Sequence, residues 1–314
     1  MIAIAMARAT WSTRLVLVFL FATFAAATYG LRVRAEDLRA SPEATRFDIP
    51  ALPADIARPF SFGLRSLVAD LMFLQAIQIH GSQRAARTAE AGAADDRAIN
   101  RLLTYATDVD PKFAGAYRFA GNAMPRHTTD RKVTNVLQAR AILKKGVVER
   151  PDDWRIPFAL GFIESYYLGD FTEAAHHLAQ AARVPGSPQY LALLATRAAA
   201  EGGDLEFGFQ LANAMAAEAT EETAQDEWQR RLLDLRMERD LRAIDAAVHR
   251  YRERVGHDPA SLHELVRGGD LAGIPAEPHG GRYELDGAGV ARSTAAQRLR
   301  IRGRNGAMAG LEIR

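Results

Sequence analysis

The sequence predicts a mainly α-helical protein made of stacked helical hairpins. The first observation is a repeat between Trp154 and Ala217, in which matching residues lie 34 positions apart. Gly169-Asp170 in one copy matches Gly203-Asp204 in the next, and such a pair suits the turn between two helices. The second observation is that small residues such as Gly161 recur where paired helices must approach closely. One hairpin cannot bury its apolar face alone, so the pattern predicts several in a stack.

The 34-residue period is similar to that of the tetratricopeptide-repeat family. An earlier copy matches the same family pattern, with a first helix over 114–124, a second over 136–148 and Tyr117 at the large aromatic position. This copy runs 40 residues from Pro111 to Pro151, so we expect an inserted loop around 126–129. The resemblance implies a right-handed α-solenoid over residues 60–255.

An apolar run precedes this region. Leu15–Leu31 contains 17 uncharged, mostly apolar residues, with arginines on both sides. A helix of this length spans roughly 25 Å, close to a hydrocarbon core of about 30 Å. Residues 1–34 are therefore predicted to be an uncleaved transmembrane anchor with the N-terminus inside, in the inner membrane of a bacterium. The alternative is a signal peptide cleaved after the Ala25–Ala27 stretch, and both readings place the bulk of the protein in the periplasm. The anchor residues are Trp11, Leu15, Phe19, Phe21 and Tyr29.

Two segments connect the anchor to the repeats. Residues 35–59 contain four prolines and are predicted to be a linker. From Phe60 to Ile77 apolar residues recur at helical spacing, which predicts a helix that caps the first repeat. The alternative is that this helix lies on the membrane or packs against a membrane partner. A further helix is expected over 93–110.

The repeats are followed by a long helix and a small module. Residues 221–255 contain neither proline nor glycine and predict one long helix or two with a bend. Residues 256–314 predict a small α+β module with a basic tail. In it, Asp258 is expected to cap a helix, Tyr283 and Leu285 to form a hairpin, and Leu299 to begin an edge strand.

About 35 residues of this module are similar to the globular end of the major pseudopilins of type II secretion. The residues that carry the similarity are Tyr251, Gly256, Pro259-Ala260-Ser261-Leu262, Leu265, Ile274-Pro275, Pro278, Gly280-Gly281 and Tyr283. The start of the chain departs from that family, because no Gly-Phe processing site precedes the apolar run. We therefore expect no role in pilus assembly from this similarity.

Composition and motifs give little support for chemistry. The chain has 314 residues, a formal net charge of +2 and no cysteine, which excludes disulfides, thiol nucleophiles and Cys-ligated zinc. Phosphate loops and nucleophile elbows are missing. Adjacent His176 and His177 would point about 100° apart on a helix, which is poor for one metal ion. We predict no enzyme activity, no cofactor, no metal and no nucleic-acid partner.

The family resemblance implies instead a concave groove lined by the first helix of each repeat. Carried over position by position, the groove residues are Arg118, Asn122, Arg155, Phe158, Phe162, Gln189 and Thr196. Arginine, amide and aromatic side chains suit an extended peptide or helix that presents an acidic or carboxylate group. Phe158 and Phe162 are alternatively core residues, and one extra residue before Gly169 would rotate the inner face.

The function expected from these features is a non-enzymatic scaffold for protein–protein interaction. It would be anchored in the inner membrane, face the periplasm and belong to a cell-envelope assembly for secretion, pili or polysaccharide export. The alternative is an exported peptide- or glycan-binding accessory of a hydrolase or transferase system.

Overall fold

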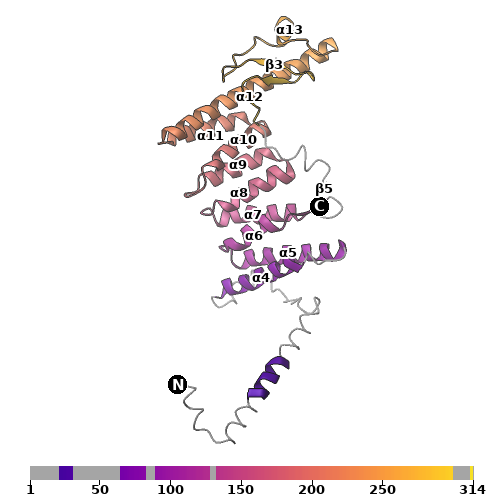
Figure 1. Cartoon of the computed structure of the whole chain (residues 1–314), viewed down its shortest axis with the longest axis vertical. Coiled ribbons are helices and arrows are strands. Elements are labelled where there is room, and N and C mark those ends of the chain that lie inside the picture. The colour runs from indigo at the N-terminus through magenta and orange to yellow at the C-terminus, as the bar shows by residue number, and fades with distance from the viewer. Residues whose placement is uncertain (1–20, 31–63, 83–88, 128–131, 300–311, 314) are drawn as a thin grey trace, which may run out of the picture. The chain divides into compact units, whose positions relative to one another are not determined.

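The computed structural model describes residues 21–30, 64–82, 89–127, 132–299 and 312–313, and these are mainly helical (Figure 1). Two compact units divide the chain, Met1–Pro53 and Ala54–Arg314. The helices of the second unit are α4 (Arg65–Ser82), α5 (Ala89–Val109), α6 (Ala114–Ala123), α7 (Val136–Glu149), α8 (Arg155–Ile163), α9 (Phe171–Ala182), α10 (Tyr190–Gly202), α11 (Leu205–Glu218), α12 (Glu222–Val255) and α13 (Leu262–Arg267). Its strands are β1 (Arg126–His127), β2 (Lys132–Thr134), β3 (Tyr283–Leu285), β4 (Ala291–Ser293) and β5 (Glu312–Ile313).

In the first unit, residues 21–30 form a helix whose side chains are all exposed. Phe21 and Tyr29, two of the predicted anchor residues, are 75% and 71% exposed. The other three, Trp11, Leu15 and Phe19, lie outside the described residues, as does the linker 35–59. Within the described part of the chain, no helix has both the length and the apolar character to cross a membrane.

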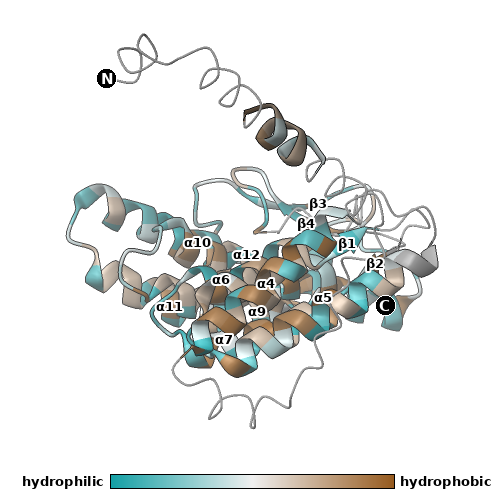
Figure 2. Ribbon diagram, turned by 90° about the horizontal axis from the view of Figure 1, so that it is seen from below, coloured by the Kyte–Doolittle hydropathy of each residue, from teal (hydrophilic) through white to brown (hydrophobic). Residues whose placement is uncertain are grey.

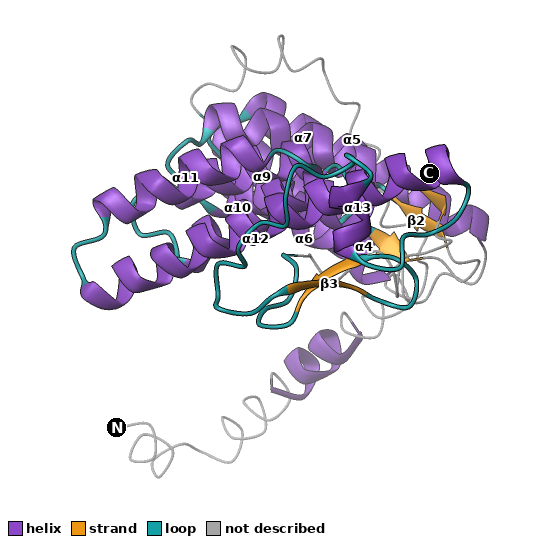
Figure 3. Cartoon of the chain, turned by 90° about the horizontal axis from the view of Figure 1, so that it is seen from above, coloured by secondary structure: helices purple, strands orange, loops and turns teal. Residues whose placement is uncertain are grey.

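In the second unit, every helix from α4 to α12 packs against the one that follows it in the chain. Helices two places apart also touch, as α5 does α7 and α6 does α8. In the view of Figure 3 the helices form the bulk of this unit, and the short strands lie at its margins. A continuous series of apolar clusters results, because each helix buries one side against its predecessor and another against its successor.

The two predicted Gly-Asp turns are confirmed and share one geometry. Gly169 and Gly203 end their helices with φ of 66° and 91°, in the left-handed region that favours glycine. Asp170 then caps α9 by accepting a hydrogen bond from the Glu173 backbone N–H at 3.3 Å. Asp204 caps α11 in the same way, from the Phe207 N–H at 3.0 Å. The turn that repeats in sequence therefore repeats in structure.

Glycine is also required where helices come closest. A Cβ on Gly161 of α8 would lie 2.8 Å from Leu178 Cγ and 3.0 Å from the Ala174 carbonyl oxygen, both in α9. A Cβ on Gly146 of α7 would lie 2.7 Å from the ring of Tyr117. That ring is fully buried, and its hydroxyl donates a hydrogen bond to the Pro111 carbonyl at 3.1 Å. Burial raises the pKa of the Tyr117 hydroxyl.

The last turn of the α8 segment is a π-helix, η3 (Glu164–Leu168). It lies immediately before Gly169, and the equivalent stretch of the second repeat, at the end of α10, has the same spacing but is α-helical. The turn directs Glu164 and Ser165 into the interior, where both are buried. Tyr166 and Tyr167 are only partly buried.

The expected insertion after α6 forms part of a small sheet. Strand β1 pairs antiparallel with β2, and β2 pairs parallel with β5 near the end of the chain. The bidentate contact of Arg126 with Asp96 of α5, at 2.8 Å and 3.3 Å, ties the start of the insertion to the helices.

Helix α12 and the C-terminal module follow the prediction with one correction. The long helix is continuous, and β3 pairs with β4 as a hairpin fastened to it through Tyr283 and Asp240, whose side chains are 3.1 Å apart. Asp258 was expected to cap the next helix, but it is bound to Arg252 and α13 begins at Leu262. Leu299 is buried outside any strand, and the rest of the expected edge strand, 300–302, lies outside the described residues.

Helix α4 is apolar on two sides. Ala69, Met72 and Ala76 are buried, as expected for a helix that packs on the first repeat. On the other side, large aliphatic residues are about half exposed; Figure 2 shows the apolar character of this helix. They are Leu64, Leu67, Leu71, Leu74 and Ile77. Exposed apolar patches on proteins often mark sites of contact with a partner or a membrane.

The close approach of α8 and α9 gives a direct test. Gly161→Ala places a methyl group against Leu178 and a backbone carbonyl, so we expect a loss of about 1–3 kcal/mol in the free energy of unfolding. Gly81→Ala near the end of α4 meets no atom within 4 Å and is the control, expected to be neutral or to stabilise by up to about 1 kcal/mol. Urea denaturation followed by circular dichroism measures both. Equal stability of the two variants would contradict the packing.

Candidate partner-binding surface

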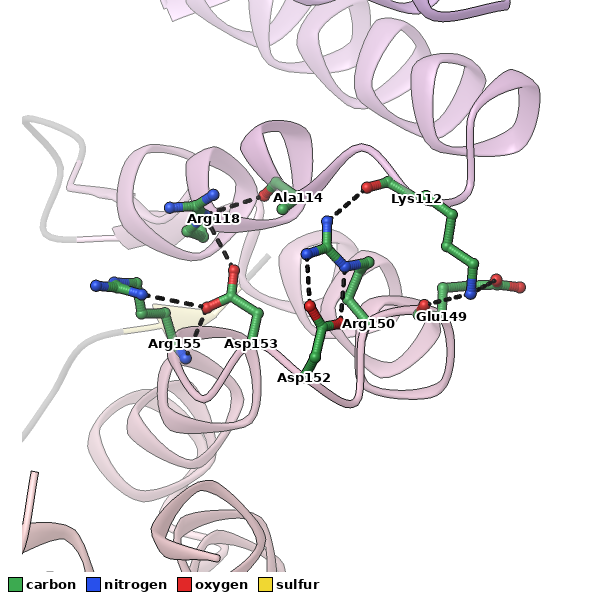
Figure 4. A network of polar contacts seen from close by, with 8 residues as sticks. All are labelled: Lys112, Ala114, Arg118, Glu149, Arg150, Asp152, Asp153 and Arg155. Carbon is green, nitrogen blue, oxygen red and sulfur yellow. Dashed lines mark hydrogen bonds and ion pairs between the residues drawn. The ribbon is translucent and has the colours of Figure 1, made fainter. Parts of the chain in front are cut away.

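Arg118 and Arg155, predicted from two different repeats, meet at one carboxylate (Figure 4). Asp153 precedes α8 and its side chain is only 7% exposed. Its two oxygens lie 3.2 Å from Arg118 Nε of α6 and 3.6 Å from Arg155 Nη1 of α8. The Arg155 backbone N–H also donates to it at 3.2 Å. One acid therefore serves two arginines, and the trio carries a net positive charge.

The two guanidinium groups remain open to solvent. The Arg118 and Arg155 side chains are 43% and 54% exposed. Arg155 also lies over the ring of Trp154, 4.7 Å from its centroid, which restrains the guanidinium by a cation–π contact. Such groups retain free N–H donors, and their positions are set by helices rather than by a loose loop. They suit recognition of a carboxylate.

A second polar network lies beside this trio (Figure 4). Arg150 Nε and Nη2 donate to the two oxygens of Asp152 at 2.9 Å and 2.8 Å, and Arg150 Nη1 donates to the Lys112 carbonyl at 2.7 Å. Lys112 Nζ in turn donates to the Glu149 carbonyl at 2.6 Å. These bonds join the loop before α6 to the loop before α8. The hydrogen bond from Arg150 lowers the pKa of the Asp152 carboxyl to about 2.

Three aromatic side chains lie near the end of α8 and in η3, C-terminal to Arg155. Phe162 is 44% exposed and stacks on Tyr166 of η3, with ring centroids 5.1 Å apart and planes 11° apart. Tyr167 meets both rings edge-on. Phe158 is half-buried and packs against the core cluster of α9 to α11, so the alternative of a core role is the correct one for this residue. Phe162 is exposed, whereas Tyr166 and Tyr167 are half-buried.

The other predicted residues divide into accessible and buried ones. Asn122 on α6 and Gln189 before α10 are exposed. Thr196 is fully buried, and its hydroxyl donates to the Leu193 carbonyl at 2.8 Å. Its expected place in a groove is wrong, because this side of α10 faces the core. The predicted residues that stay accessible on α6 and α8, with Tyr166 of η3 that stacks on one of them, are Arg118, Asn122, Arg155, Phe162 and Tyr166. We call this set the α6–α8 surface.

Sequence reasoning missed Asp153 and Tyr166. The signal for Asp153 was present, because an acid directly before a helix that begins with arginine is placed to pair with it. Tyr166 could not be assigned, since the π turn decides where its ring points. A cavity of about 380 Å³ also lies away from this surface, between α5 and α7. It is lined by Asn100, Thr104, Thr107, Leu137, Gln138, Ala141, Ile142 and Lys145.

One cluster of metal-ligating side chains occurs among the described residues. Glu164 of η3 and the pair Glu173 and His177 of α9 bring one ligand atom each within 4.8 Å of one another. His176 and His177, adjacent in the sequence, are not the pair that meets here. The informative pair is Glu173 with His177, which are four residues apart and share one face of the helix.

Comparisons with models of known protein families, with curated proteins and with solved structures give no match to this chain. The resemblance to tetratricopeptide repeats and the shorter similarity to pseudopilins stay predictions.

The Arg150–Asp152 contact makes a measurable electrostatic prediction. Arg150→Gln removes the charged donor, so the pKa of Asp152 is expected to rise from about 2 toward the ordinary value of an aspartate carboxyl. The carboxyl pKa is lowered in the folded state, so the contact stabilises the fold above the unfolded pKa and is lost as pH falls toward 2. NMR titration of the Asp152 side chain measures the change. An unchanged pKa would show that the contact does not form in solution.

Proposed function

We propose that this protein is a membrane-anchored, non-enzymatic scaffold that holds a partner protein on the α6–α8 surface. The succession of helix pairs, with each packed on the next, supports a solenoid of the tetratricopeptide-repeat type. In such an array one side of the first helices stays free, and the exposure of Arg118, Asn122 and Arg155 supports that assignment here. The α6–α8 surface would be the part of this face that recognises the partner.

The observation that carries the proposal is the sharing of Asp153 by two half-exposed arginines. A buried carboxylate with one arginine would be a satisfied structural pair. The second arginine leaves an excess positive charge fixed between two helices. A carboxylate of the partner would neutralise this charge and accept charge-assisted hydrogen bonds from the arginines. Phe162, about two helical turns further along α8, offers apolar area, and arginine with aromatic residues is the composition typical of the residues that dominate binding energy at interfaces.

The N-terminal segment supports the proposed location. The apolar run flanked by arginines supports an anchor in a bacterial inner membrane, with the second unit in the periplasm and a role in a cell-envelope assembly. The exposed leucine side of α4 is a further apolar contact site close in sequence to that anchor. We expect the full chain to fractionate with membranes and a chain lacking residues 1–34 to be released from them. Protease added to spheroplasts should digest the full chain.

A second candidate, an accessory that binds peptide or glycan, is favoured by the aromatic group of Phe162, Tyr166 and Tyr167. Sugar rings stack on exposed aromatic faces, and Tyr hydroxyls supply hydrogen bonds. Titration of the full chain with soluble glycan fragments, followed by the fluorescence of the aromatic residues, distinguishes the two candidates. Saturable binding that is lost in Phe162→Ala would favour the accessory.

Charge reversal tests the scaffold directly. Arg118→Glu with Arg155→Glu should abolish co-purification of the partner from detergent-solubilised membranes, because a partner carboxylate would meet three acids. The control is Arg183→Glu with Arg236→Glu, which makes the same change in net charge at two exposed arginines of α9–α12. If Arg118→Glu with Arg155→Glu captures as much partner as the control does, the binding site does not lie on this surface.

The reversal also leaves the buried Asp153 without a cation, which costs stability. Loss of capture therefore counts as loss of binding only if circular dichroism shows that Arg118→Glu with Arg155→Glu keeps the helicity of the unmodified chain. The milder pair Arg118→Gln with Arg155→Gln gives a second measurement, in which we expect affinity for the partner to fall about tenfold or more.

A further inference from the structure

Three potential metal ligands converge behind the α6–α8 surface, from two elements that pack on each other. Glu173 and His177 occupy one face of α9, one helical turn apart, and Glu164 reaches them from η3. The closest approach is between His177 Nδ1 and Glu164 Oε2, at 2.6 Å. Two side chains at this helical spacing with a third from a neighbouring element form a chelating arrangement.

Glu164 is unusual for a helix interior, because its side chain is fully buried. Burial of a carboxylate is costly unless it is paired and hydrogen-bonded. Arg140 of α7 provides one partner, with Nε at 3.0 Å from Glu164 Oε1. The second oxygen, Oε2, is the one directed at His177. Arg140 thus fixes the orientation of the carboxylate and leaves one oxygen for a further interaction.

The second repeat shows that the fold does not require these polar side chains. At the offset of 34 residues, Glu164, Glu173 and His177 correspond to Ala198, Phe207 and Leu211. Ala198 and Leu211 are buried there, and Phe207 packs against the same cluster. An apolar contact between the two helices of a pair thus serves the second repeat. The first repeat replaces that contact with a glutamate, a glutamate and a histidine.

We propose that Glu164, Glu173 and His177 bind one divalent transition-metal ion of the Zn²⁺ class. Imidazole nitrogen with carboxylate oxygen is a ligand set for zinc and its neighbours, whereas Mg²⁺ and Ca²⁺ prefer oxygen ligands alone. Ligand atoms at about 2.0–2.2 Å from one ion must lie closer together than 4.8 Å, so the ion would draw Glu173 inward. Water or a partner group would occupy the remaining position.

The charges around the site are consistent with a dication. The carboxylates of Glu164 and Glu173 contribute two negative charges, and Asp170, 3.5 Å from Arg140 Nη2, contributes a third. Arg140 offsets one of them. A dication with neutral His177 balances the remaining two. Arg140 then acts as the partner that orients a ligating carboxylate, the role that supporting residues play in known metal sites.

Bound metal would link α9 to the turn that positions the exposed aromatic rings. Glu164 opens η3, which also carries Tyr166, and Tyr166 stacks on Phe162. The ion would thereby hold the aromatic end of the α6–α8 surface in place. This effect is independent of whether the partner proposed above binds there.

Titration of the full chain in detergent with Co²⁺, a spectroscopic substitute for Zn²⁺, tests the site. The chain must carry no histidine tag. We expect one equivalent of Co²⁺ to bind with the visible absorption of a low-coordinate nitrogen and oxygen site, and Zn²⁺ to displace it. Mg²⁺ should not. Glu173→Gln and His177→Gln are each expected to weaken binding about tenfold or more. His176→Gln, on the neighbouring residue, is the matched control and should bind as the unmodified chain does.

Glu173→Gln keeps the contacts of Glu164 with both Arg140 and His177, so it is the variant that leaves the fold intact. Its thermal unfolding in EDTA should match that of the unmodified chain, and only the unmodified chain should gain melting temperature on addition of Zn²⁺. Absence of saturable Co²⁺ binding, or binding by Glu173→Gln and His177→Gln as tight as that of the unmodified chain, would overturn the proposal. Glu164 would then be only part of an ion pair that joins α7 to α9.

Discussion

Close approach between successive helices is the constraint on which this molecule depends. At several of these contacts only a glycine leaves room, as at Gly146 of α7 against Tyr117 of α6, Gly161 of α8 against Leu178 of α9 and Gly202 of α10 against Thr172 of α9. Because the helices touch at these points, their apolar sides form continuous clusters from α4 to α12. A helix that is packed on both neighbours has little freedom to move, so side chains on its remaining side keep fixed positions.

Because the helices are held rigidly, the side chains of the α6–α8 surface keep fixed distances from one another. Arg118 and Arg155 belong to different helices, and their separation is set by helix packing together with the bonds that tie the intervening loops at Lys112 and Arg150. Both arginines meet Asp153 without losing their exposure. The same packing brings Glu164 against α9. This buried position holds a glutamate, whereas the equivalent position of the next repeat holds Ala198.

The sequence allowed prediction wherever the signal was local. The Gly-Asp turns follow from glycine's access to positive φ and from the capping preference of aspartate, and the single long helix follows from the absence of proline and glycine. Features that depend on competition between partners were not predictable. Asp258 was expected to cap a helix, yet Arg252 binds it, and Thr196 was placed in a groove although its side of α10 is buried. The Glu164 side chain points into the interior because of a π turn, and no pattern of residues in the sequence predicts that turn.

The most direct measurement of the central claim is site-specific photo-cross-linking in cells. A photoreactive residue at Asn122 lies on the α6–α8 surface, and one at Gln180 lies on exposed α9 outside it. We expect a discrete adduct from position 122 that is absent from position 180 and disappears when Arg155 is reversed to glutamate. Equal labelling from both positions, or no adduct from position 122, would contradict the account.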